Sequence, residues 1–390
     1  MKIPLYKIFW DESDAEAVAG AVRKGSDWAI GPNIAEFEGI VSEYLGRKYC
    51  VAFNSGTSAL HAALLALDVG SGTEVIVPSF TFIATANSAL FVGAKPVFAD
   101  IEADTYGLDP RSVENALTKK TRAVIPIHYG GGACKIEELR AIADRHGLAL
   151  VEDAAESLGA STSGGKVGSF GDVAILSFCG NKVMTCGEGG MAATDSRDTY
   201  ERLKLVRSHG RLETENYFTS AKIFDYMTLG YNWRMSNITA ALAISQFRKL
   251  DRMAGMRRAH AEVMSKQLSQ SPVITTPTAV GHEQNVYQMY TIRLKNNRLR
   301  EGLRNHLAER EISAKVYFDP VHRTSYYQKL GFQDTFLPIT DRLSKEVLTL
   351  PIYPSMTSEE SNYVVSNVLE YVNQSNAAEE EMTVANASRR

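Results

Sequence analysis

Short apolar segments alternate with helical segments through the first half of this 390-residue chain, and this alternation limits the fold more than any other feature. The pattern predicts strands at 49–53, 74–78, 95–98, 122–127, 148–152 and 173–178. Strands that are apolar along their whole length are typical of a parallel sheet with helices on both faces. The sequence therefore predicts an α/β fold built on a mainly parallel sheet.

Polar and aromatic residues follow several of these strands directly. Residues 55–57 (Ser-Gly-Thr) come after the first strand, Phe80 and Phe82 after the second, Asp153 after the fifth and Lys182 after the sixth. In parallel α/β sheets, ligands bind at the carboxyl ends of the strands. We therefore expect these residues to lie together on one edge of the sheet.

The pattern changes in the second half of the chain. The later segments are predicted as a long helix bent or broken near Gly255, then a strand, a helix, a strand and a last helix, at 238–268, 287–294, 298–309, 313–318 and 358–372. This predicts a large α/β domain at 1–250 and a small α+β domain at 251–375. The polar, acid-rich residues 376–390 are predicted to be a disordered tail.

Charge and cysteine spacing narrow the class of ligand. A formal net charge of −3 provides no field that would attract nucleic acid or an anionic membrane. The four cysteines share no C-x-x-C spacing and no H-E-x-x-H motif occurs, so no metal site is predicted. The start of the chain does not resemble a signal peptide, and no apolar run approaches the roughly 18 residues of a membrane span. We expect a cytoplasmic protein with a small-molecule site.

One lysine stands alone between two glycine-marked turns, in the stretch D-V-A-I-L-S-F-C-G-N-K-V-M-T-C-G-E-G-G-M at 172–191. Two interpretations of Lys182 are open. Most lysines in such loops extend into solvent. A partly desolvated amine can instead attack a carbonyl group and form a Schiff base.

The residues of this edge suit pyridoxal 5′-phosphate. Lys182 would bind its aldehyde, and Asp153, at the end of a buried strand, would face the pyridine nitrogen. The turn at 55–58 would receive the phosphate at a helix N-terminus. The structural alternative for Asp153 is a helix N-cap.

Two further features would complete such a site. Phe82 or Phe80 would stack on the cofactor ring, and Ser177 would be an additional donor near the phosphate. The alternatives are core packing for both phenylalanines and a buried strand position for the serine.

Five motifs, taken in order, resemble those of the DegT/DnrJ/EryC1/StrS sugar aminotransferases. They are N-S-G-T-S-A-L, P-S-F-T-F-I-A-T-A-N, V-E-D-A-A-E-S-L-G-A, G-D-V-A-I-L-S-F-C-G-N-K-V-M-T-C-G-E-G-G-M and G-Y-N-W-R-M-S. The resemblance covers the chain to about residue 370. It implies a fold-type I enzyme with pyridoxal 5′-phosphate that moves an amino group from L-glutamate to a nucleotide-linked keto-sugar and releases 2-oxoglutarate. It also implies a role in polysaccharide biosynthesis, such as that of an O-antigen.

The resemblance assigns roles to the residues at the matching positions. Lys182 would be the lysine that binds the cofactor aldehyde, and Asp153 the partner of the pyridine nitrogen. Gly56, Thr57 and Ser177 would hold the phosphate.

Other roles concern the ring, the substrate and the second subunit. Phe82 would stack on the ring, and Asn232 would reach the phosphate in the neighbouring subunit, which implies a homodimer with shared sites. Trp28 and Gly31 resemble residues of a loop near the substrate. His322 resembles a histidine near the nucleotide-sugar.

Glu156 departs from the family pattern. Most members have Gln or His three residues after the aspartate, near the cofactor's phenolic oxygen, and an ionised carboxylate there would repel a phenolate. Glu156, assigned to cofactor binding, must then be protonated, turned away or bridged by water. The form A-E-S-L-G-A resembles the branch that includes GDP-perosamine synthase, which favours a 4-keto-6-deoxyhexose.

Two other functions stay open at this point. The same fold could aminate a 3-keto-sugar or a keto-cyclitol. The chain could also be a non-catalytic regulator that binds pyridoxal phosphate.

Overall fold

The structure, a computed structural model, describes residues 1–212, 220–221, 223–277 and 284–387. Its α-helices are α1 Glu12–Arg23, α2 Pro32–Leu45, α3 Gly56–Ala66, α4 Ile83–Phe91, α5 Pro110–Ala116, α6 Ile136–His146, α7 Arg197–Arg207, α8 Asn237–Phe247, α9 Leu250–Leu268, α10 Asn297–Glu309, α11 Ser325–Lys329, α12 Pro338–Glu346 and α13 Ser358–Ala387. Its strands are β1 Tyr49–Phe53, β2 Glu74–Pro78, β3 Lys95–Ala99, β4 Thr121–Val124, β5 Ala149–Asp153, β6 Ser161–Thr162, β7 Gly165–Lys166, β8 Val173–Ser177, β9 Gly190–Thr194, β10 Ile274–Thr275, β11 Tyr290–Leu294 and β12 Val347–Leu350. Two short 3₁₀ turns are η1 Tyr129–Gly131 and η2 Val321–Arg323.

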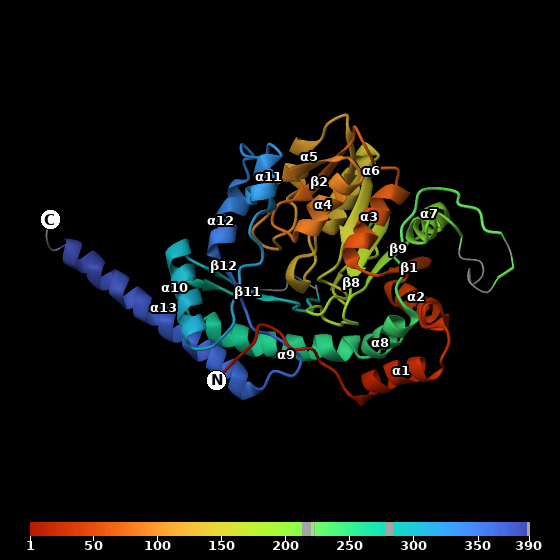
Figure 1. Ribbon diagram of the computed structural model, residues 1–390. Helices are drawn as coiled ribbons and strands as arrows, with labels where there is room; N and C mark the ends of the chain where they lie inside the picture. The colour runs from red at the N-terminus through yellow and green to blue at the C-terminus, as the bar shows by residue number, and fades with distance from the viewer. Residues whose placement is uncertain (213–219, 222, 278–283, 388–390) are drawn as a thin grey trace.

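The central sheet has seven strands in the order β1-β9-β8-β5-β4-β2-β3. Neighbours from β8 to β3 pair in parallel, whereas β9 runs antiparallel to both β1 and β8. β9 can do so because it follows β8 through a hairpin loop, which needs no crossover helix. The prediction of a mainly parallel sheet flanked by helices is confirmed (Figure 1).

Alternate residues of each strand pack on opposite faces of the sheet. In β8, Val173 and Ile175 pack with α3, α4 and α7, whereas Ala174 and Leu176 pack with α2 and α8. Further along the sheet, α5 and α6 cover the second face. Each buried Val, Leu or Ile side chain contributes about 1.5–3 kcal/mol, which is why these strands are apolar on both sides.

A second, smaller sheet has the order β10-β11-β12 and is antiparallel. Its core is shared with α9, α10 and α13 and includes Ile3. The segment predicted as a strand at 313–318 forms only an isolated bridge, between Lys315 and Thr349. α13 continues to Ala387, into the stretch where composition predicts a disordered tail, and residues 388–390 lie outside the described residues. The division into domains at residue 250 stays a prediction.

The long helix predicted at 238–268 is broken, but not at Gly255. The break lies between α8 and α9, at residues 248 and 249. Lys249 is held there by ion pairs from its Nζ to Asp14 at 2.6 Å and Asp11 at 2.9 Å, at the start of α1. Gly255 lies inside α9, and the two helices run almost end to end below the central sheet (Figure 1).

A close backbone contact fixes the turn between β1 and α3. A Cβ atom on Gly190, the first residue of β9, would lie 2.3 Å from the carbonyl carbon of Ser55 and 2.5 Å from the amide nitrogen of Gly56. Protein interiors have no room for such an overlap, so only glycine fits at this position.

We expect Gly190→Ala to lower the free energy of unfolding by about 1–3 kcal/mol or more, because the added methyl group must displace the backbone of residues 55 and 56. Urea denaturation measures this loss. Gly39→Ala in α2 is the matched control, because a Cβ there meets no atom within 4 Å and alanine is favoured over glycine in helices by about 0.5–1 kcal/mol. Equal stability of the Gly190→Ala variant and the unaltered chain would contradict the close contact.

Candidate active site

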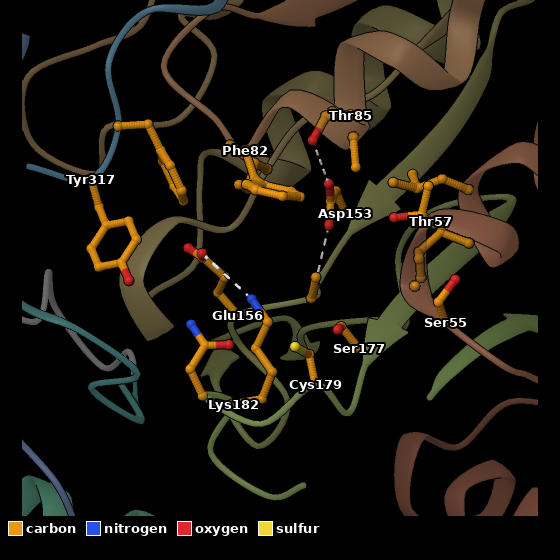
Figure 2. A pocket seen from close by; sticks show the side chains of 18 of the residues that line it. Ser55, Thr57, Phe82, Thr85, Asp153, Glu156, Ser177, Cys179, Lys182 and Tyr317 are labelled. Atoms are coloured by element: carbon orange, nitrogen blue, oxygen red, sulfur yellow. Dashed lines mark hydrogen bonds and ion pairs between the residues drawn. The ribbon is translucent and has the colours of Figure 1, made fainter. Parts of the chain in front are cut away.

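A pocket of about 440 Å³ opens at the carboxyl edge of the central sheet. Its walls come from the segments that follow β1, β2, β5 and β8, where ligands bind in α/β sheets. Lys315, Tyr317 and Phe318, beside the smaller sheet, complete them. The sequence-predicted residues that line it are Gly56, Thr57, Phe82, Asp153, Glu156, Ser177 and Lys182 (Figure 2).

Lys182 lies on the hairpin loop between β8 and β9. Backbone hydrogen bonds from Phe178 N–H to Gly189 O (2.9 Å) and from Cys186 N–H to Phe178 O (3.1 Å) close this loop. Val183 and Met184, the next two residues, are buried in the core beneath it. The Lys182 side chain is only 15 % exposed and points into the pocket, so it is not a lysine extended into solvent (Figure 2).

Asp153 is the last residue of β5 and is 3 % exposed. Thr85 Oγ1 donates to its Oδ2 at 2.7 Å, and Ala155 N–H donates to its Oδ1 at 3.2 Å. Burial raises the pKa of the Asp153 carboxyl, and these two donors oppose the rise. Turns rather than a helix follow at 154–160, so the helix N-cap alternative is wrong.

The start of α3 lies directly beside the end of β8. A Cβ atom on Gly56 would be 3.1 Å from Ser177 Cβ, so the two residues are in contact. Ser55 caps the helix by accepting the N–H of Ser58 at 3.1 Å. The first N–H groups of a helix have no intrahelical acceptor, and the helix dipole favours an anion there. The arrangement at Gly56, Thr57 and Ser177 can hold a phosphate.

The two candidate phenylalanines differ sharply in exposure. Phe82 is 58 % exposed and lines the pocket, with its ring centroid 6.3 Å from that of Phe318. Phe80 is fully buried and packs against Tyr129 at 5.3 Å. Of the two, only Phe82 is placed to contact a ligand.

Glu156 is turned into the pocket rather than away from it. Its Oε1 lies 3.6 Å from Lys182 Nζ, and its Oε2 accepts the N–H of Gly130 at 3.0 Å. Burial raises the pKa of the Glu156 carboxyl, and the charge of Lys182 opposes the rise. An amine and a carboxyl group are thus paired where both are largely removed from water.

The remaining predicted residues do not line this pocket. Trp28 and Gly31 pack against the first residue of α8, Asn237. Trp28 O accepts the N–H of Asn237 at 3.0 Å. Asn232 is exposed and forms a bridge with Ser208. His322 is fully buried away from the pocket, where its Nδ1 lies 2.7 Å from Ser79 Oγ.

The sequence assigns no site role to several residues of the pocket, among them Thr85, Lys315, Tyr317 and Phe318. Thr85 stands in the motif P-S-F-T-F-I-A-T-A-N, but its contact with Asp153 joins residues 68 positions apart in the sequence. Lys315, Tyr317 and Phe318 lie beside the smaller sheet, so only the packing of that part of the chain against the central sheet could reveal them.

Two absences hold for the part of the chain that the structure describes. No group of three or more His, Cys, Asp or Glu side chains is placed to hold a metal ion. None of the helices in these described residues is both long and apolar enough to cross a membrane.

Comparison with known proteins identifies what this chain is similar to. The sequence profile of the DegT/DnrJ/EryC1/StrS aminotransferase family matches residues 10–369. GDP-perosamine synthase of Caulobacter vibrioides is 35 % identical over 341 residues, which cover 87 % of this chain and 90 % of that protein.

Solved structures have the same fold. PseC of Helicobacter pylori, an aminotransferase involved in the biosynthesis of pseudoaminic acid, superimposes with a TM-score of 0.89 at 26 % identity and covers 96 % of this chain and 100 % of that one. NtdA of Bacillus subtilis, with bound cofactor PMP, gives a TM-score of 0.86 at 28 % identity and covers 95 % and 85 % of the two chains. PMP is the aminated form of pyridoxal phosphate.

The residues of the pocket fit this cofactor. The pocket contains an amine for the aldehyde, a buried carboxyl group for a protonated ring nitrogen, and a helix N-terminus for the phosphate. The raised pKa of Asp153 is the cost of burying its charge, and a cationic ring beside it would offset that cost.

Truncation of the two phenylalanines should separate packing from ligand contact. We expect Phe80→Ala to lower the free energy of unfolding by about 3–5 kcal/mol. Phe82→Ala should change it by less than about 0.5 kcal/mol, because an exposed ring buries little surface. Phe82→Ala should instead release pyridoxal phosphate faster, as measured by the loss of visible absorbance on dilution. A stable Phe80→Ala variant, or unchanged cofactor release in Phe82→Ala, would contradict these placements.

Proposed function

The chain belongs to the DegT/DnrJ/EryC1/StrS aminotransferase family and is a pyridoxal-phosphate-dependent sugar aminotransferase, and we propose that its substrate is a nucleotide-linked 4-keto-6-deoxyhexose. The observation that carries the proposal is the 35 % identity with GDP-perosamine synthase across nearly the whole chain. L-Glutamate would be the amino donor and 2-oxoglutarate its product. The reaction would take place in the cytoplasm, on the route to a polysaccharide such as an O-antigen.

Lys182 and Asp153 have distinct proposed roles. When bound, pyridoxal phosphate supplies an electron sink and carries the amino group between the two substrates. Lys182 Nζ removes a proton from the α-carbon of glutamate and later delivers one to the sugar carbon that receives nitrogen. Asp153 supplies the negative charge that keeps the ring nitrogen protonated, and Thr85 holds its carboxyl group in position at 2.7 Å.

The phosphate would be held by Gly56, Thr57 and Ser177, with Phe82 against the ring. Two observations support these roles. Gly56 contacts Ser177 at the start of α3, and all four residues line the pocket. His322 has no place in this proposal, because it is buried elsewhere.

Lys315 would receive the anionic part of each substrate. It lines the outer wall of the pocket, and its Nζ lies 4.7 Å above the ring of Tyr317. Glutamate brings a second carboxylate and a nucleotide-sugar brings a diphosphate, so both need a cation at this wall.

We further propose a homodimer in which each site is completed by Asn232 of the partner subunit, with Trp28 and Gly31 also delivered across the interface. Exposed apolar side chains lie beside Asn232 in the chain, among them Met227, 63 % exposed, and Leu229, 78 % exposed. Apolar groups that gather on a surface are typical of an interface.

A panel of nucleotide keto-sugars with L-glutamate tests the substrate, with products identified by mass spectrometry. We expect the 4-keto-6-deoxyhexose of GDP to be aminated, and Lys182→Ala to lose about 10²–10⁴-fold or more in rate because the proton-transfer group is gone. Lys266→Ala, at an exposed position of α9, is the control with unchanged rate. Amination of only a 3-keto-sugar or keto-cyclitol would overturn the substrate, whereas turnover at the native rate in Lys182→Ala would overturn the site.

Mixing two inactive variants tests the shared site. A mixed dimer of Lys182→Ala and Asn232→Asp chains has one intact site and one site with both changes. Half of the dimers in an equal mixture are mixed, so co-refolding should restore about a quarter of the wild-type activity. If the mixture is no more active than the two variants alone, Lys182 and Asn232 do not act across a subunit interface.

A further inference from the structure

Glu156 and Lys182 form a largely buried pair at the inner wall of the pocket. Their side chains are 5 % and 15 % exposed, and Oε1 lies 3.6 Å from Nζ. Figure 2 shows the two charged ends directed toward each other. This separation is slightly longer than a hydrogen bond, and a small rotation of either side chain would close it.

The two carboxyl groups near Lys182 are stabilised differently. Asp153 receives hydrogen bonds on both oxygens from neutral donors, Thr85 and Ala155. Glu156 receives one such bond, from Gly130 N–H to Oε2, and its other oxygen faces Lys182. The ionised form of Glu156 therefore depends more on a charge at Nζ than that of Asp153 does, although the charge of Lys182 lowers the pKa of both carboxyl groups.

The other ionisable groups around Glu156 do not replace this charge. Tyr129 of η1 and Tyr317 are phenols whose pKa values burial raises, so they are neutral near pH 7. Asp153 is an anion whose field raises the pKa of Glu156, and Lys182 is the cation whose field lowers it. Lys315 and Glu188 line the same pocket, but Lys182 is the cation paired with Glu156.

We infer that Glu156 exchanges a proton with Lys182: Oε1 takes the proton from Nζ before this nitrogen bonds to a carbonyl carbon, and returns it when that bond breaks. The inference rests on the proposed function of Lys182. The transfer breaks one N–H bond and forms one O–H bond, and the electron pair left on Nζ is the pair that attacks the carbonyl. The carbonyl oxygen leaves as water with the two protons that remain on Nζ. An ion pair becomes a neutral amine and a neutral carboxyl group, so protons and charge balance without another reactant.

Burial makes this exchange energetically feasible. Two charges removed from water lose hydration that their mutual attraction only partly restores, so burial narrows the free-energy gap between the ion pair and the neutral pair. A proton returns readily between two groups when their proton affinities are similar.

The exchange also accounts for the departure from the family pattern. Once Lys182 is bonded to the cofactor's carbonyl carbon, Nζ no longer needs an anionic neighbour. Glu156 then holds the proton, and a neutral carboxyl group does not repel a phenolate oxygen as an ionised one would. The substitution of Glu for Gln or His becomes a means of storing the proton that Lys182 must give up.

Infrared spectroscopy of the holoenzyme tests where the proton resides. The difference spectrum of holoenzyme minus cofactor-free chain should contain a carboxylic-acid carbonyl band that is absent from Glu156→Gln. Glu188→Gln is the matched control, because Glu188 lines the same pocket but contacts Cys179 Sγ, at 3.6 Å; it should keep the band. A holoenzyme without this band, or a band that persists in Glu156→Gln, would overturn the proposal.

The pH dependence of amine reactivity tests the coupling itself. Labelling of the cofactor-free chain with a small amine-reactive reagent, located at Lys182 by peptide mass spectrometry, gives a midpoint for the neutral amine. In Glu156→Gln the midpoint should move to lower pH by about 1–3 units, because the anion that stabilises the ammonium form is gone. Glu188→Gln should leave the midpoint unchanged. Glu156→Asp should give a smaller shift, and this variant replaces Glu156→Gln in the test if Glu156→Gln does not fold.

An unchanged midpoint in Glu156→Gln would contradict the exchange. If Glu156 only supported the fold, its replacement would not move the midpoint of Lys182 labelling. Neither readout contains a sugar or an amino donor. A wrong substrate in the proposed function would therefore leave both results intact, so the two failures can be told apart.

Discussion

The parallel pairing of β5 with β8 is the contact on which the site depends. Their register places Asp153 beside Ile175, so both strands end at the same edge and at nearly the same height. Asp153 closes β5, and β8 continues into the hairpin loop that carries Lys182. A shift of one residue in β8 would exchange side chains between its two packed faces, so Val173 and Ile175 would have to fit the space that Ala174 and Leu176 fill.

The site also has to accommodate charge in a confined space. Burial raises the pKa values of both Asp153 and Glu156, and different groups oppose the rise at each carboxyl. Two neutral donors serve Asp153, and the amine of Lys182 serves Glu156. A cofactor with a cationic ring and a dianionic phosphate supplies the charges that these groups and the start of α3 are placed to meet.

Much of this arrangement could be predicted from the sequence, because strand ends in parallel sheets converge. Apolar strands followed by turns and polar residues identify Gly56, Asp153 and Lys182 from the sequence alone. Contacts between distant segments could not be predicted: Thr85 of α4 donates to Asp153 at the end of β5, and Tyr317 reaches the pocket from a segment far along the chain. Local pattern also misplaced the helix break at Gly255, because the ion pairs of Lys249 with α1 are a tertiary feature. The resemblance placed His322 near the substrate, yet burial against Ser79 keeps it from the pocket of its own chain.

The central claim is that the lysine on the β8–β9 loop, and no other, binds the cofactor. Borohydride reduction of the holoenzyme, followed by digestion and peptide mass spectrometry, tests it most directly because it fixes the bond in place. The account predicts that the mass of the reduced cofactor is found on the peptide that contains Lys182. Its appearance on another lysine of the pocket, such as Lys315, or on no peptide at all, would contradict the account.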